Sequence, residues 1–206
     1  MHPETTKKLI LTSITFVVMP LLYKSIQELN LNSVTFHTLI DDAIPFVPLF
    51  GIPYLLYYCL LMLVYYKYWN LEYNKFEHIA FSFLLIDIIA FLFYALYQTY
   101  TIRHEDPTFI VPFIYSIDHA TNAFPSLHVA NTILAYTTIK DLTMHKKYLT
   151  ILCISIILST VLIKQHAFLD VIGGIILSVI VIKYYYSTQY GKLWTVAEKY
   201  EVKKVK

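Results

Sequence analysis

The chain has 206 residues, of which 57% are hydrophobic and only 15% are charged, and its formal net charge is +2. Together with a mean hydropathy of +0.56, this composition argues against a soluble domain and is typical of a membrane-embedded protein. The small positive charge does not indicate nucleic-acid binding. No repeat, low-complexity segment or linker divides the sequence, so we expect one domain over residues 1–206.

Six apolar stretches are predicted to cross the membrane as helices, because about 20 apolar residues span a hydrocarbon core of about 30 Å. In chain order they are Leu9–Leu22, Ala43–Tyr66, Ile79–Ile102, Leu127–Ile139, Tyr148–Ile163 and Val171–Ile182. The predicted fold class is therefore an all-α, six-transmembrane-helix bundle. The fourth and sixth stretches reach full length only with their polar flanks, so five spans and one re-entrant segment are the alternative.

Three further features refine this prediction. No small-residue cleavage site separates the first stretch from Lys24, so we do not expect a removable signal peptide. Asp87 lies in the middle of the third stretch, where an isolated carboxylate is costly, and we expect it to hydrogen-bond a neighbouring helix. Gly173 and Gly174 begin the last stretch and predict close helix packing there.

The lysines and arginines predict the orientation of the bundle. With six spans and the N-terminus inside, only Lys24, Arg103 and Lys164 of the sixteen basic residues lie outside. Cytoplasmic segments carry an excess of lysine and arginine, so both termini are expected to be cytoplasmic, in a multi-pass protein of the plasma membrane. Arg103, Lys164 and two histidines, His128 and His166, then share the outer face. Such a cluster predicts an anion site, most simply for phosphate.

His166 and Asp170 are four residues apart and so share one helix face. The carboxylate is expected to accept a hydrogen bond from one imidazole nitrogen, which leaves the other nitrogen available as a nucleophile toward phosphorus. Alternatively, the pair forms a purely structural hydrogen bond. His128 follows Pro125-Ser126, a helix-start pattern in which Ser126 is expected to cap the helix. His128 is a candidate general acid and base, and the alternative is an interfacial histidine without a catalytic role.

Five further polar residues are weaker candidates for contacts with a headgroup or an acceptor: Asp41, Asp42, Asp118, His119 and Asn122. Helix capping is the alternative that we favour for the two aspartates near residue 40. No CxxC, HExxH or glycine-rich phosphate loop is present, so no metal and no cofactor are expected.

The stretches Pro125-Ser126-Leu127-His128 and Lys164-Gln165-His166, with Asp170 beyond them, resemble the type 2 phosphatidic acid phosphatase superfamily. The resemblance runs from about Ile40 to Gly174. Leu127 stands where most members carry glycine, as in the branch that includes inositol phosphorylceramide synthase and relatives of sphingomyelin synthase. The resemblance implies a six-helix membrane fold and metal-independent chemistry through a phosphohistidine.

Carried over by position, the resemblance implies that His166 is the nucleophile, Asp170 its partner and His128 the acid and base. It also implies that Ser126 and Arg103 bind the phosphate. Two positions depart from the family pattern. His104 stands in place of the usual proline, and Ser159-Thr160 stands in place of Ser-Arg, an arginine that Lys164 is expected to replace.

The leading hypothesis is a lipid phosphate phosphatase whose site faces the extracytoplasmic side. The expected substrates are phosphatidic acid, phosphatidylglycerophosphate, an isoprenyl pyrophosphate or another phospholipid of the bilayer. The first alternative is a phosphotransferase that moves a phosphoalcohol headgroup between lipids, like inositol phosphorylceramide synthase. A third hypothesis, from a different class, is a catalytically inactive lipid-binding or transport protein, and transport predicts polar residues near the bilayer midplane.

Overall fold

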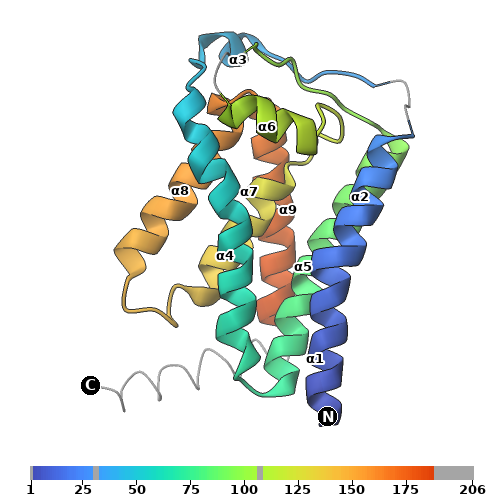
Figure 1. The fold of residues 1–206 in the computed structure, drawn as a ribbon, viewed down its shortest axis with the longest axis vertical. Helices are drawn as coiled ribbons and strands as arrows, with labels where there is room; N and C mark the ends of the chain where they lie inside the picture. Colours follow the sequence, from blue (N-terminus) through green and yellow to red (C-terminus); the bar gives the residue numbers. More distant parts are fainter. Residues whose placement is uncertain (1, 30–32, 106–108, 188–206) are drawn as a thin grey trace.

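The computed structural model describes residues 2–29, 33–105 and 109–187, and over these ranges the chain is built from helices (Figure 1). The N-terminal α1 (Pro3–Ser13), the π-helical η1 (Ile14–Val18) and α2 (Met19–Gln27) form one continuous helix. Pro20 has no backbone N–H to donate, and the wider π-helical turn before it accommodates that loss. The other long helices are α4 (Gly51–Trp69), α5 (Tyr73–Leu96), α7 (Leu127–Ile139), α8 (Lys146–Leu162) and α9 (Phe168–Ser187).

Four helical segments of the described chain are long and apolar enough to cross a membrane: Pro3–Gln27, Pro48–Trp69, Tyr73–Leu96 and Phe168–Tyr185. This finding confirms the predicted all-helical membrane protein. The helices α7, with 13 residues, and α8, with 17, are shorter than the roughly 20 residues that a span requires.

The helix α7 is the centre of the bundle, because it packs against α9, α8, α4 and α5 (Figure 1). Its Val129, Ala130, Leu134 and Ala135 have no exposed surface. A helix enclosed in this way meets protein rather than lipid over most of its surface. Short length and polar residues in α7 are therefore compatible with a membrane-embedded bundle.

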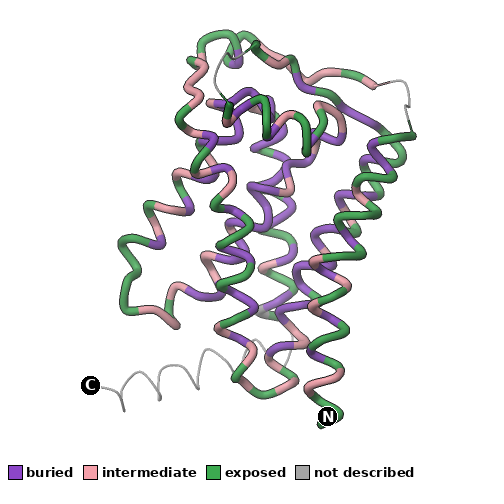
Figure 2. The backbone as a smooth tube through the Cα atoms, in the orientation of Figure 1, coloured by how far each residue is buried: buried purple, intermediate pink, exposed green. Residues whose placement is uncertain are grey.

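The outward faces of the long helices carry exposed apolar residues. In Figure 2 the backbone of α1, α4 and α8 includes many residues coloured as exposed. Leu21 is 64% exposed, Leu92 58% and Ile180 56%. A soluble monomer rarely exposes apolar surface so extensively, whereas a lipid-facing helix requires it.

The predicted end of the third apolar stretch at Ile102 is wrong. The helix α5 ends at Leu96, and the residues after it form two isolated bridges, Val34 with Thr99 and Tyr100 with Thr121. Backbone pairing with these two segments replaces the last helical turns. The sequence prediction also missed α6 (Ile110–Ile117), which lies with α3 (Leu39–Ala43) and the short 3₁₀ turn η2 (Pro48–Phe50) at one end of the bundle.

The prediction of close packing at the glycine pair is confirmed. A Cβ atom at Gly174 would lie 2.6 Å from the carbonyl oxygen of Ser126 and 2.9 Å from Cβ of Val129. These neighbours are a backbone atom and a stiff β-branched side chain, so neither can move away easily. Gly174 thus sets how closely α9 approaches the start of α7.

We expect Gly174→Ala to destabilise the protein by about 1–3 kcal/mol, because the added methyl group overpacks this contact. Thermal unfolding in detergent micelles measures the loss. Ser178→Ala, one helical turn further along α9, is the matched control, since among the described residues the Ser178 hydroxyl bonds only the carbonyl of Ile175 in its own helix. Unfolding of Gly174→Ala at the wild-type temperature would contradict the tight contact.

Candidate functional site

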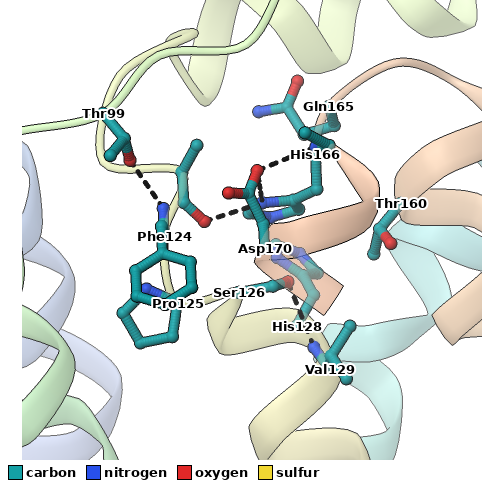
Figure 3. Close-up of polar contacts among 12 residues, drawn as sticks. Thr99, Phe124, Pro125, Ser126, His128, Val129, Thr160, Gln165, His166 and Asp170 are labelled. Atoms are coloured by element: carbon teal, nitrogen blue, oxygen red, sulfur yellow. Dashed lines mark hydrogen bonds and ion pairs between the residues drawn. The ribbon is translucent and has the colours of Figure 1, made fainter. Parts of the chain in front are cut away.

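The two sequence motifs meet where α7 and α9 begin. The backbone N–H of Ser126 donates to the carbonyl of Asp170 at 3.1 Å, and this bond joins the two helix starts. The Ser126 side chain caps α7 by accepting from the N–H of Val129 at 3.4 Å, as predicted (Figure 3). Helix N-termini carry partial positive charge, and two of them converge at this point.

His166 lies in the turn between α8 and α9 and is only 7% exposed. Its Nδ1 lies 3.0 Å from the carbonyl oxygen of Ala123 (Figure 3). A carbonyl can only accept, so Nδ1 carries the proton and Nε2 of the neutral ring keeps its lone pair. This tautomer is the one that a nucleophilic histidine requires.

The predicted hydrogen bond between His166 and Asp170 is not formed. The distance from Nδ1 to Oδ2 is 3.6 Å, which allows an ion-pair contact but is too long for a hydrogen bond. Oδ2 of Asp170 instead accepts from the N–H of Ala167 at 2.8 Å and so caps the start of α9. Asp170 thus combines the structural role with an electrostatic one, because its carboxylate stays close enough to stabilise a positively charged imidazole.

His128 is the second residue of α7, and its ring centroid lies 6.1 Å from that of His166. Its ring stacks on Tyr54 at 4.1 Å and packs against Tyr57 at 4.2 Å. Nδ1 of His128 lies 3.4 Å from the Tyr54 hydroxyl, while no described residue hydrogen-bonds its buried Nε2. One imidazole nitrogen is therefore oriented by the protein, and the other is left available for proton transfer.

Asp118, at the C-terminal end of α6, positions the side chains around His128. Its carboxylate accepts hydrogen bonds from the hydroxyls of Tyr54 at 2.6 Å and Tyr23 at 2.9 Å, and from the Gln27 amide at 3.4 Å. Because the Tyr54 hydroxyl donates its proton to Asp118, its oxygen accepts from Nδ1–H of His128. Asp118 thus fixes His128 through Tyr54 rather than by direct contact.

Both histidines line a cavity of about 470 Å³ between the N-terminal helix and α4, with α5 and α7 behind it. Asp118 and Asn122 line the same cavity. Its other walls are mostly apolar and aromatic, and among its lining residues are Val17, Leu21, Tyr58, Leu61 and Phe91. The cavity therefore combines a polar end at the two histidines with apolar walls, which suits an amphipathic ligand.

Arg103 does not line this cavity. Its guanidinium donates to the carbonyls of Tyr115, at 3.2 Å, and Asp118, and to the side-chain oxygen of Gln165 at 2.7 Å. It also lies 4.1 Å from the centre of the Tyr115 ring. Burial lowers the pKa of Arg103, and the Asp118 carboxylate opposes that shift. In the structure Arg103 holds the α6 segment through its two terminal nitrogens, while its buried Nε has no hydrogen-bond partner among the described residues. Phosphate binding by Arg103 stays a prediction.

Lys164 is also absent from the cavity. Its ammonium group is buried and donates to the carbonyls of Asp41 at 2.7 Å and Ile44 at 2.6 Å. Its backbone φ of 56° is unusual for a residue with a side chain. The predicted phosphate contact is therefore replaced by a tie between the α3 segment and the turn that carries His166.

We expect Lys164→Met to destabilise the protein by about 2 kcal/mol, since two charge-assisted hydrogen bonds are lost. The KM for a lipid phosphate should change by less than about threefold. Lys183→Met, at an exposed position near the far end of α9, is the matched control. Unchanged thermal unfolding together with a KM raised more than about tenfold would restore Lys164 as a phosphate ligand.

Of the remaining candidate residues, some have a structural role and one lines the cavity. Asp41 forms the predicted capping box with Thr38 and also accepts from the N–H of Phe168 at 2.7 Å. Burial alone would raise the pKa of Asp41, but these hydrogen bonds outweigh it and the pKa is lowered. Asp42 is exposed and pairs with His37 at 2.7 Å.

His119 is exposed and does not line the cavity. Asn122, with a φ of 60°, lines the cavity and accepts from the Gln98 amide at 3.2 Å. Ser159 and Thr160, at the positions where the resemblance implied Ser-Arg, bond carbonyls of their own helix.

Sequence reasoning missed three residues at the site. Tyr54 orients His128, Gln165 links Arg103 to the Asp118 carbonyl at 3.1 Å, and Lys24 lines the cavity on the N-terminal helix. The chain has nineteen tyrosines, so Tyr54 carried no distinctive signal. Lys24 could have been singled out, since it is one of only three basic residues predicted outside.

No protein-family model, no curated protein and no solved structure matches this chain.

Proposed function

We propose that this chain is an integral membrane phosphatase for lipid phosphates that acts through a phosphohistidine on His166. The observation that carries the proposal is the pair of buried histidines in one cavity, 6.1 Å apart between ring centroids, each with Nδ1 oriented by the protein. In both rings this orientation leaves Nε2 for chemistry. A single phosphate ester can contact both rings at this separation.

In the first step, Nε2 of His166 attacks phosphorus and the bond between phosphorus and the lipid oxygen breaks. The protonated form of His128 donates its Nε2 proton to the departing oxygen. The carboxylate of Asp170, 3.6 Å from Nδ1, stabilises the positive charge that forms on the His166 ring. The products of this step are the lipid alcohol and a phosphohistidine.

In the second step, Nε2 of His128 takes a proton from water while the water oxygen attacks phosphorus. The nitrogen–phosphorus bond breaks, inorganic phosphate leaves, and both histidines return to their starting protonation states. Asp118 and Tyr54 keep the His128 ring in place for both proton transfers. The chemistry uses only side chains of the chain and requires no metal.

The negative charge of the phosphate is balanced by the N-terminus of α7 and by Lys24 at the cavity wall, because the N–H groups of Ala167 and Phe168 at the start of α9 already donate to Asp170 and Asp41. This arrangement does not draw on the terminal nitrogens of Arg103 or the ammonium group of Lys164, which donate to carbonyl and amide oxygens of the protein.

The proposal includes six membrane crossings, with α7 and α8 as the two short ones, and a site on the extracytoplasmic side of the plasma membrane. Successive long helices run in alternate directions through the bundle, which supports this topology (Figure 1). The skewed distribution of lysine and arginine supports the orientation.

The test uses purified protein in mixed micelles with phosphatidic acid, phosphatidylglycerophosphate and an isoprenyl pyrophosphate, with EDTA present. Free phosphate and lipid products are measured together, and release of phosphate in EDTA is the expected result. Formation of headgroup-exchanged lipid without free phosphate would favour the phosphotransferase instead. Absence of both products from every lipid would overturn the enzymatic proposal.

A further inference from the structure

A second polar cluster lies in the cavity, one helical turn beyond the histidines. It consists of Tyr57 on α4, Asp87 on α5 and Asn131 on α7, all three of which line the cavity. The Asn131 side-chain N–H₂ donates to the Tyr57 hydroxyl at 3.1 Å and to Oδ1 of Asp87 at 3.2 Å. The latter bond confirms the hydrogen bond to a neighbouring helix that the sequence predicted for Asp87.

The cluster has unused hydrogen-bonding capacity. Asn131 is 3% exposed, and no described residue donates to its side-chain oxygen. A buried polar atom without a partner is costly, so such an atom in a cavity wall is a candidate ligand contact. Asp87 adds a carboxylate at the same level, so the cluster offers acceptors to a ligand that carries a donor.

The polar cluster lies close to the histidines at which we propose that the phosphate reacts. His128 and Asn131 are three residues apart on α7, which corresponds to about 4.5 Å along the helix axis. Tyr57 contacts the His128 ring, so the two polar levels of the cavity adjoin each other. In a lipid phosphate, a hydroxyl or amide on the second carbon from the phosphoester oxygen lies on the order of 5 Å from phosphorus in an extended chain.

We infer that Asn131 and Asp87 bind a free hydroxyl or amide N–H on the lipid backbone next to the phosphate. This inference rests on the proposed function for the position of the phosphate, and it narrows the substrate class. Lipid phosphates with such a donor are preferred. An isoprenyl chain has no donor to offer, and a fully esterified glycerol offers only acceptors, which leave the Asn131 oxygen unpaired.

The probes are 1-acyl-glycerol 3-phosphate, which has a free hydroxyl at carbon 2, and its 2-deoxy analogue. The expected result is a kcat/KM about tenfold higher for the hydroxyl compound, because one buried hydrogen bond distinguishes the two lipids. The corresponding non-hydrolysable phosphonates, bound to the His166→Ala protein, should differ in Kd by a similar factor. Binding to this variant reports recognition without turnover.

The matched variant is the double replacement Asp87→Leu and Asn131→Leu, which removes both partners together and leaves no unpaired charge. It should lower the preference, measured as the ratio of kcat/KM for the two lipids, to within about twofold. Thermal unfolding of the double variant establishes that the protein is folded.

The outcomes separate the two proposals. Equal kcat/KM and equal Kd for the two lipids in the wild-type and His166→Ala proteins would overturn the inference and leave the phosphatase intact. A Kd preference for the hydroxyl phosphonate without phosphate release from either lipid would overturn the phosphatase and support the binding site. Equal losses for both lipids in the folded double variant would also count against donor recognition.

Discussion

Replacement of His166 by alanine should lower phosphate release from a lipid phosphate by at least about 10³-fold. The nucleophile is then missing, and the remaining groups of the site can only bind and polarise the ester. The loss should be equal in kcat and in kcat/KM, because the bond from Nε2 to phosphorus forms only during the reaction. Steady-state assays in mixed micelles measure both quantities.

Two controls accompany His166→Ala. His145→Ala removes an exposed histidine in the turn between α7 and α8 and should leave activity unchanged. Thermal unfolding of His166→Ala shows whether the protein is folded, because the lost bond to the Ala123 carbonyl should cost only about 1 kcal/mol. A folded His166→Ala protein that retains more than about a tenth of wild-type turnover would contradict the assigned role.

Replacement of His128 by alanine should lower turnover of lipid phosphates by about 10²- to 10⁴-fold, the usual range for loss of a general acid and base. The effect should depend on the leaving group. An alkyl-substituted nitrophenyl phosphate has a leaving group that needs no protonation, so its first step should survive in His128→Ala. The second step, in which His128 activates water, should remain slow.

A rapid-quench experiment separates these steps. His128→Ala should release a burst of about one equivalent of nitrophenol and then stop, whereas the wild-type protein should continue. Tyr54→Phe provides a graded comparison, since it keeps the stacked ring but removes the oxygen that accepts from Nδ1 of His128. Equal loss on lipid and aryl phosphates, without a burst, would show that His128 does not protonate the leaving group.

The helices were predictable because their signals are local. The start of α7 at Leu127 follows from proline and serine at a helix N-terminus, and its observed end at Ile139 matches the predicted one. The end of α5 was not predictable, because Thr99 and Tyr100 leave the helix to pair with Val34 and Thr121, which are distant in sequence. Apolarity alone does not distinguish a last helical turn from such an extended segment.

The meeting of His128 and His166 was also predictable, because both lie at helix ends on the same side of the bundle. The roles of the two cations were not. Arg103 and Lys164 are two of the three basic residues predicted on the outer side of the membrane, and this small number favoured a role in phosphate binding. In the structure Arg103 and Lys164 donate hydrogen bonds to backbone carbonyls of other segments. A sequence pattern does not show which backbone carbonyls will need a side-chain donor in the folded protein.

The polar residues around the histidines illustrate the same limit. Tyr54 and Asp118 act on His128 only because α4 and α6 lie side by side at this end of the bundle. Asn131 follows His128 by three residues, so the sequence predicts that both lie on the same face of α7. The sequence does not predict that the side-chain oxygen of Asn131 lacks a hydrogen-bond partner. Hydrogen-bond satisfaction is a property of the whole fold.

The most direct test of the central claim is to locate the phosphoryl group on the protein. His128→Ala is mixed with the alkyl-substituted nitrophenyl phosphate, quenched during the burst under alkaline conditions and digested, and the peptides are analysed by mass spectrometry. Phosphate on the imidazole of His166, in an amount equal to the nitrophenol burst, is the result that the proposed mechanism predicts. A burst without phosphorylated protein, or phosphate on any other residue, would contradict it.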